Sequence, residues 1–161
     1  MNLKEKALSF FKSLEEDKDY IFYNEASFQN DLAFYLKTEL EVNKYRIVVE
    51  RSISNDTLIK LKKRFVDITI INRSNYEKAY IEIKFPKGSK YQKRIENCMI
   101  DINFLTSIKA QNMNNQCLFI FLTPKSEYKN KLGSKFDWHE LTNANFESDK
   151  KVTLYYFISE I

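Results

Sequence analysis

The chain has 161 residues, 43% of them hydrophobic and 15% aromatic, and it contains only two Gly and two Pro. This composition excludes a disordered or low-complexity protein, and the length predicts a single domain over residues 1–161 around one hydrophobic core. The formal net charge of +4, from 26 Lys and Arg against 22 Asp and Glu, permits nucleic-acid binding without demonstrating it.

The start of the chain predicts neither an export signal nor a membrane anchor. The opening MNLKEKALSFFKSLEED is charged within its first residues, lacks an apolar core and is followed by no small-residue cleavage site. No apolar run approaches the roughly 18 to 20 residues that span a bilayer. We therefore expect a cytoplasmic protein that does not contact membranes. Cys98 and Cys117 lack a CxxC spacing, which favours buried free thiols over a redox pair or metal ligands.

Two amphipathic helices are predicted first. Residues 3–16 repeat apolar side chains at helical spacing and form a leading helix within residues 1–18. A second helix follows in NEASFQNDLAFYLKTEL, with Asn24 as its predicted N-cap. Its predicted buried stripe consists of Phe28, Leu32, Tyr35, Leu36 and Leu40.

The apolar spacing then changes from helical to alternating, which predicts strands. YRIVVERSI is the first, and RFVDITII and AYIEIKF form an antiparallel hairpin through the turn NRSNYEK. A helix over residues 91–113 follows, and CLFIFLT predicts a strand covered on both faces. The predicted buried stripe of that helix is Ile95, Met99, Ile102, Leu105 and Ile108. An irregular part leads to a final strand, LYYFIS, so the order implies an α/β sandwich around a mixed sheet.

Three charged residues interrupt the apolar runs of the hairpin. Asp67 lies within FVDITII, and Glu82 and Lys84 lie within AYIEIKF. An unpaired charge in a buried strand costs several kcal/mol, so these residues need partners. Side chains two apart in a strand share a face, and Asp67 joins Glu82 and Lys84 there if the hairpin is in register. We expect the three to converge.

Two carboxylates beside an ammonium have a chemical use. Hard divalent cations such as Mg²⁺ or Mn²⁺ bind carboxylate oxygens and activate water for attack on a phosphate, and a Lys can orient or deprotonate that water. The set therefore predicts metal-assisted phosphodiester hydrolysis, with Asp67 and Glu82 as ligands and Lys84 assisting the water. E-x-K occurs three times in this Lys-rich chain, and only the middle copy lies in an apolar strand. Ordinary edge-strand salt bridges are the alternative.

These residues resemble the PD-(D/E)xK nuclease superfamily, which includes restriction enzymes, Holliday junction resolvases and phage exonucleases. By this resemblance, Asp67 is the motif's Asp, and Glu82 with Lys84 is its Glu-x-Lys. Val66 stands where the motif's name has Pro, a common variation. The resemblance implies a restriction endonuclease-like αβββαβ core, a mixed sheet flanked by helices, with an extra N-terminal helix and a C-terminal strand.

The resemblance extends along the chain. Residues 24–123 follow the family's core order, which leaves residues 124–161 as a C-terminal extension. Glu25 matches the Glu that many members carry on the first core helix, where it supports the metal or Lys84. A group of small bacterial members is similar in DINFLTSI, beginning at Asp101, and in FIFLTPKSEY, which ends at Tyr128. This closer resemblance names no substrate.

Other polar residues admit two interpretations. Glu50 in VVERSI is a candidate third metal ligand, although a surface ion pair with Arg51 or a Lys is favoured. Gln92 is a weaker candidate for a supporting group near the site. His139 in FDWHEL has no Ser or Cys partner motif, so a surface or packing role is favoured over a general base.

Two basic clusters bracket the hairpin and are candidate phosphate contacts. The first precedes the Asp67 strand and the second follows the Glu82 strand, so the two can share one edge of the sheet. Solvated lysines are an equally good interpretation. The clusters are Lys60, Lys62, Lys63 and Arg64, and Lys87, Lys90, Lys93 and Arg94.

The sequence as a whole predicts a small metal-dependent nuclease. DNA is favoured over RNA because most of the resembling family acts on DNA, and endonuclease and exonuclease action both stay open. No zinc finger or helix-turn-helix is present in the sequence, so specificity is expected from a homodimer, a partner protein or DNA shape. A defence, mobile-element or repair context fits equally. The alternatives are a non-catalytic nucleic-acid- or protein-binding module on the same fold, and a resolvase-like enzyme on branched DNA.

Overall fold

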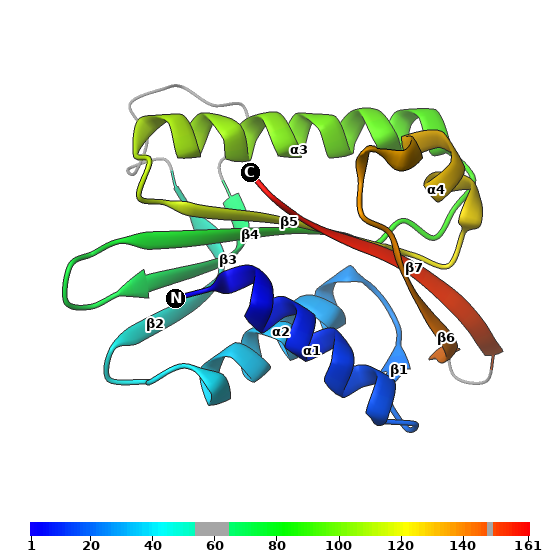
Figure 1. The fold of residues 1–161 in the computed structure, drawn as a ribbon, viewed down its shortest axis with the longest axis horizontal. Coiled ribbons are helices and arrows are strands. Elements are labelled where there is room, and N and C mark those ends of the chain that lie inside the picture. Colours follow the sequence, from blue (N-terminus) through cyan, green and yellow to red (C-terminus); the bar gives the residue numbers. More distant parts are fainter. Residues whose placement is uncertain (54–64, 148–149) are drawn as a thin grey trace.

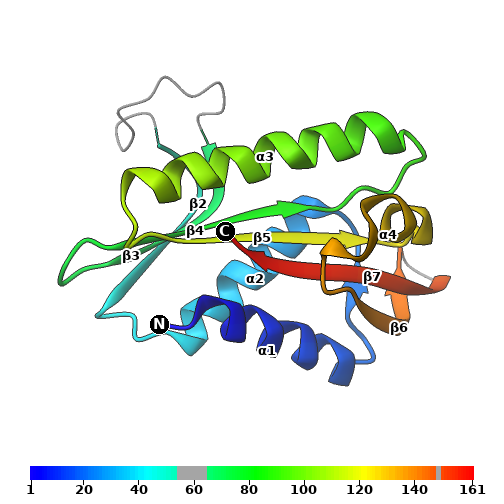
Figure 2. The ribbon, with the colours of Figure 1, turned by 45° about the horizontal axis from the view of Figure 1, so that its top comes forward.

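The chain folds into one mixed sheet between two helical layers. The structure, a computed structural model, describes residues 1–53, 65–147 and 150–161. In Figures 1 and 2, α3 lies above the sheet, and α1 and α2 lie below it. The α/β class and the mixed sheet flanked by helices are thereby confirmed. Within the described ranges no helix is long and apolar enough to cross a bilayer.

The first two helices begin where the sequence provides caps. The Asn2 side chain accepts a hydrogen bond from Glu5 N–H at the start of α1. Asn24 and Ser27 form a reciprocal capping box at the start of α2, which confirms the predicted N-cap. The helices are α1 (Leu3–Glu16), α2 (Glu25–Glu39), α3 (Tyr91–Gln111) and α4 (Ser126–Leu132), followed by a 3₁₀ turn, η1 (Gly133–Lys135).

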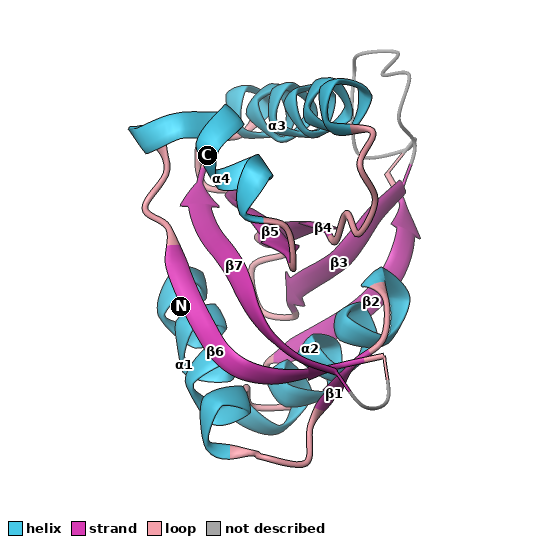
Figure 3. Cartoon of the chain, turned by 90° about the vertical axis from the view of Figure 1, so that its right-hand side faces the viewer, coloured by secondary structure: helices cyan, strands magenta, loops and turns pink. Residues whose placement is uncertain are grey.

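The sheet has seven strands in the order β1-β6-β7-β5-β4-β3-β2. β2, β3 and β4 form two antiparallel pairs, and β4 and β5 are parallel and joined through α3. Figure 3 shows the sheet curling from β6 and β7 round to β3 and β2. The strands are β1 (Ile21–Phe22), β2 (Tyr45–Ser52), β3 (Phe65–Asn72), β4 (Lys78–Lys84), β5 (Gln116–Thr123), β6 (His139–Phe146) and β7 (Lys150–Glu160).

Alternating side chains of the central strands fill a core on each face of the sheet. In β4, Ile81 and Ile83 pack on the α1 and α2 side, while Tyr80 packs on the α3 side. β5 is buried on both faces, as its continuous apolar run predicts. Cys98 and Cys117 are free and buried, and burial raises the pKa of each thiol to about 12. The expected free thiols are confirmed.

Parts of the fold differ from the sequence prediction. The extension after residue 123 contains α4, η1 and β6 as well as the predicted final strand. The buried side of α3 includes Cys98, Asp101 and Phe104, whereas the predicted Ile95, Met99 and Ile102 are only half-buried. α3 is therefore rotated relative to its apolar pattern, and an acidic side chain faces the sheet.

The Asn24 cap should be measurable because it fixes the first turn of α2. Asn24→Ala removes the acceptor for Ser27 N–H and should lower the free energy of unfolding by about 1 kcal/mol in urea titrations. Asn24→Asp should remain close to wild type. Asn30→Ala is the matched control, since this exposed residue of the same helix caps nothing. Equal losses at the two positions would contradict the capping role.

Candidate active site

Asp67 lies where the two hairpin strands stop pairing through their backbones. The β3–β4 pairing ends at Ile68 and Ile81. One residue further along, the Asp67 carboxylate Oδ2 accepts a hydrogen bond of 2.7 Å from Ile83 N–H. The buried Gln29 amide on α2 donates to the backbone carbonyl of Asp67 at 2.8 Å. Asp67 is thus fixed from both sides, with its carboxylate directed towards β4.

Lys84, at the end of β4, is the centre of the site. Its ammonium lies 3.0 Å from Glu82 Oε1, 3.3 Å from Asp101 Oδ2 and 3.7 Å from Glu25 Oε1. It also donates to the Ile83 carbonyl at 2.9 Å. The partners come from β4, α3 and α2, so one side chain joins the sheet to both helical layers.

The cluster is buried at one end and accessible at the other. The Glu82 side chain is 0% exposed and that of Asp101 7%, whereas Lys84 is 21% and Glu25 41% exposed. Glu25 begins α2, where the positive end of the helix dipole favours a carboxylate. Its second oxygen accepts from Phe85 N–H at 2.8 Å, which holds the side chain over the end of β4. Glu25 and Lys84 are thus the solvent-accessible side chains of the cluster.

The charges around Lys84 decide its protonation. Burial lowers the pKa of Lys84, but Glu82, Glu25, Asp101 and Asp67 together raise it further, so the net pKa lies above the ordinary 10.5. Of the two roles that the sequence allowed for Lys84, this setting favours orienting the water over deprotonating it. The charged form contributes stability that is fully present below pH 10.5 and is lost as the pH rises through the folded-state pKa. At neutral pH, Lys84 is a cation and a hydrogen-bond donor.

The structure therefore brings Asp67, Glu82, Lys84 and Glu25 together, and it adds Asp101. The sequence pointed to Asp101 only through the resemblance. A signal was present, since Asp101 is three residues after Cys98 and four before Leu105, both on the buried side of α3. An acidic residue at such a position needs a cation opposite it.

Three other candidates lie apart from the Lys84 contacts. Glu50, in β2, has an exposed side chain and a left-handed φ of 49°. Gln92 is exposed and bonds to Glu96 on the next turn of α3. His139 stacks on Tyr156 in β7, as its predicted packing role requires.

Tyr128 of the resembling FIFLTPKSEY segment is fully buried. Its hydroxyl donates to the Gly88 carbonyl at 2.9 Å. It thus ties α4 to the segment that follows β4 and holds the end of the β4 strand in place from the α3 side.

The basic candidates differ in their surroundings. Lys87 pairs with Glu147 at 2.7 Å and donates to the Tyr23 carbonyl, so it links three segments. The remaining described residues of the second cluster, Lys90, Lys93 and Arg94, are exposed at the start of α3. The first cluster, Lys60, Lys62, Lys63 and Arg64, lies outside the described residues.

The donor set suits a hard divalent cation. Four carboxylates, from Asp67, Glu82, Glu25 and Asp101, act on one ammonium, so these five side chains carry an excess of negative charge. Oxygen-only donors are those that Mg²⁺ and Mn²⁺ prefer. Within residues 1–53, 65–147 and 150–161, no three His, Cys, Asp or Glu side chains are gathered closely enough to form a finished metal site.

No protein-family model, curated protein or solved structure matches the chain.

Removing the central ammonium should destabilise the fold. Lys84→Met keeps the length of the side chain but leaves buried carboxylates without this cation, and should lower the free energy of unfolding by about 3 kcal/mol. Acidification should recover part of the loss, because protonation relieves the repulsion. Lys129→Met, in the exposed Lys129–Glu140 pair, is the control and should change stability by less than about 1 kcal/mol. Urea titrations that give equal, small losses would contradict this account of the cluster.

Proposed function

We propose that the chain is a divalent-metal-dependent nuclease that hydrolyses phosphodiester bonds. The observation that carries the proposal is the Lys84 ammonium held among Glu82, Asp101 and Glu25, beside an Asp67 carboxylate at the point where β3 and β4 separate. A polar cluster of this kind, partly accessible and with a perturbed lysine, is typical of functional sites.

The element order supports the same proposal. From α2 to β5 the chain runs helix, three strands, helix and strand, with β4 and β5 parallel. This is the αβββαβ order of the restriction endonuclease-like core, and the three motif residues lie on its second and third strands. We infer that the family resemblance reflects the function of this site.

In the proposed site, Asp67 and Glu82 would hold Mg²⁺ or Mn²⁺, with Glu50 in the neighbouring strand as a weaker candidate. When bound, the ion supplies a Lewis acid for the phosphate and lowers the pKa of a coordinated water. The Ile83 amide keeps the Asp67 carboxylate oriented. Glu82 is fully buried, so the electrostatic interactions of its carboxylate act in a low-dielectric setting and are stronger than they would be in water.

Lys84 would act as a fixed positive charge and donor. Its ammonium can stabilise the charge that develops on the phosphate and orient the attacking water. Asp101 and Glu25 are positioning residues, since they hold the ammonium at the end of β4 and keep it protonated. This role differs from that of a general base, because the surrounding carboxylates raise the pKa of Lys84 and favour its protonated form.

For the substrate we propose only a class of nucleic acid and a general biological context. We favour DNA over RNA, in a defence, mobile-element or repair context, with a homodimer or partner protein supplying specificity. Lys90, Lys93 and Arg94 are exposed at the start of α3, the helix that also carries Asp101, and can neutralise phosphates.

The short ion-pair distances around Lys84 favour a second candidate function, a binding protein that does not cut nucleic acid. Lys84 and its carboxylates already compensate one another in part, as they would in a purely structural cluster. On that interpretation the fold binds nucleic acid or a protein without cutting.

A cleavage assay separates the two functions. Linear, nicked, single-stranded and four-way DNA, with RNA alongside, are incubated with Mg²⁺, Mn²⁺ or EDTA. We expect metal-dependent cleavage that falls by about 10²- to 10⁴-fold in Asp67→Asn, Glu82→Gln and Lys84→Met. Circular dichroism checks that each variant is folded.

The chain offers a matched control for this assay. Glu127 and Lys129 form the same E-x-K spacing on the surface helix α4. Glu127→Gln and Lys129→Met therefore make the same chemical changes outside the site and should cut at the wild-type rate. Absence of cleavage with every substrate and metal, or equal losses in the α4 variants, would rule out the proposed nuclease site.

A further inference from the structure

A basic pocket lies at the far end of the same hairpin. It has a volume of about 540 Å³ and is lined by Arg46, Arg51, Ile71, Arg73, Tyr76 and Lys78. Arg46, Ile71 and Lys78 are register partners across β2, β3 and β4, so their side chains form one row on one face. Among the residues that the structure describes, the pocket lining includes no acidic side chain. We call this site the hairpin pocket.

The hairpin pocket and the candidate active site share a face of the sheet. Lys78, Tyr80, Glu82 and Lys84 alternate along β4 and therefore point the same way, and Tyr80 packs in the core beneath α3. The four residue steps from Lys78 to Glu82 correspond to roughly 13 Å at about 3.3 Å per residue.

Two guanidinium groups of the pocket are available for an anion. Arg46 and Arg73 are exposed, and within the described part of the chain neither forms an ion pair. The planar guanidinium fork matches the oxygens of a phosphate. Arg51 and Lys78 add positive charge around the same space.

Backbone conformation places two of the lining side chains. Glu50 has a left-handed φ of 49° immediately before Arg51, and such a kink re-aims the next side chain of a strand. This explains how Arg46 and Arg51, five residues apart, line one pocket.

Tyr76 is held in a left-handed conformation as well. Its φ is 58°, and the Asn72 and Asn75 side chains bond to the turn around it. The residue is 75% exposed. The turn thus presents an aromatic side chain to solvent at the edge of a pocket lined by arginines.

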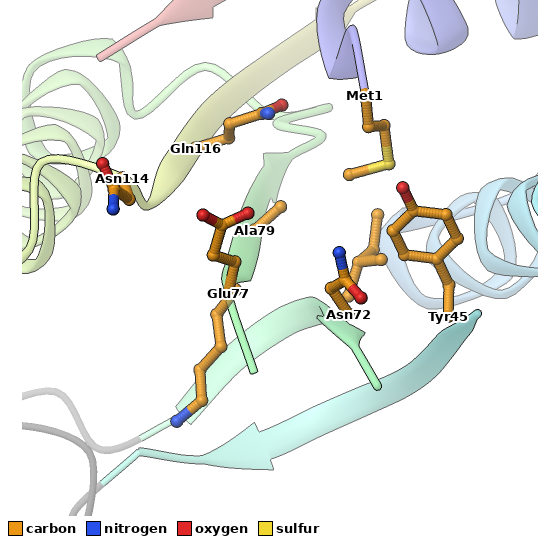
Figure 4. Close-up of a pocket in the computed structure, with 9 residues that line it drawn as sticks. Met1, Tyr45, Asn72, Glu77, Ala79, Asn114 and Gln116 are labelled. Carbon is orange, nitrogen blue, oxygen red and sulfur yellow. The ribbon is translucent and has the colours of Figure 1, made fainter. Parts of the chain in front are cut away.

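The other face of the hairpin is different. The cavity there is only about 80 Å³, and its lining includes Met1, Tyr45 and Ala79. Figure 4 shows the Met1 side chain directed towards the Tyr45 ring, which partly fills this space. The large basic space is therefore a property of the α3 face, the face that also carries Glu82 and Lys84.

We propose that the hairpin pocket binds a single-stranded segment of nucleic acid. Arg46 and Arg73 contact its phosphodiester backbone, and the Tyr76 ring stacks on an unstacked base. The choice of nucleic acid among polyanions rests on the proposed nuclease function. A duplex keeps its bases stacked, so it can use the arginines but not the tyrosine.

Binding is measured without cleavage, by fluorescence anisotropy of a labelled oligothymidylate in EDTA. Arg46→Gln/Arg73→Gln should weaken binding about tenfold at low salt and flatten the log–log salt slope by about 1.4, or 0.7 per contact. Tyr76→Ala should weaken it by about 5- to 150-fold, while Tyr76→Phe retains the stacking ring and the affinity. Wild-type protein should bind the single strand more tightly than a duplex of equal length.

The control removes the same charge from the opposite layer. Lys12→Gln/Lys37→Gln replaces exposed lysines of α1 and α2 and should leave affinity and salt slope near wild type. The inference is overturned if the pocket variants bind as wild type does, if the control loses as much, or if duplex binds equally well. Cleavage that persists while pocket variants bind normally would overturn this inference and leave the nuclease proposal standing. Binding that depends on the pocket, without any cleavage, would support this inference and overturn the nuclease proposal.

Discussion

The structure depends on one partly buried cation. The Lys84 ammonium contacts carboxylates from β4, α3 and α2, and it lies where the sheet meets both helical layers. Fully buried Glu82 and nearly buried Asp101 are tolerable only with a positive charge beside them, because isolated charges in a protein interior are strongly disfavoured. The cluster therefore constrains the rotation of α3 over the sheet, the position of the first turn of α2 and the end of β4. The elements that assemble the fold also assemble the site.

The β3–β4 hairpin links this cluster to the hairpin pocket. At one end its backbones separate and the Asp67 carboxylate bonds to Ile83 N–H in place of strand pairing. At the other end, a turn fixed by asparagine side chains presents Tyr76 beside Arg73. Because side chains alternate along β4, Lys78 of the pocket and Glu82 and Lys84 of the cluster all lie on the α3 face of the sheet. Buried Tyr80 and α3 separate the two sites, so the proposed binding and the proposed cleavage involve different residues.

Much of the site could be predicted from the sequence, because buried strands seldom contain charged residues. Asp67, Glu82 and Lys84 stood out against apolar neighbours, and Glu25 stood out at a capped helix start. Asp101 did not, because the apolar spacing of α3 favoured Ile95 and Ile102, and the rotation of a helix against a sheet is set by tertiary contacts. The hairpin pocket could not be predicted from the sequence, because Arg46 and Arg73 become neighbours only when β2 pairs with β3. Short β1 escaped detection because its two residues pair with β6, far along the chain.

The central claim is that the carboxylates around Lys84 hold a divalent metal for phosphodiester hydrolysis. Isothermal titration of Mn²⁺ into the folded wild-type protein tests it most directly, with Glu82→Gln as the variant and Glu127→Gln as the surface control. The account predicts saturable Mn²⁺ binding in wild type and in the control, and at least about tenfold weaker binding when Glu82 loses its charge. Wild-type protein that takes up no Mn²⁺, or a Glu82→Gln variant that binds it as tightly as wild type, would contradict the account.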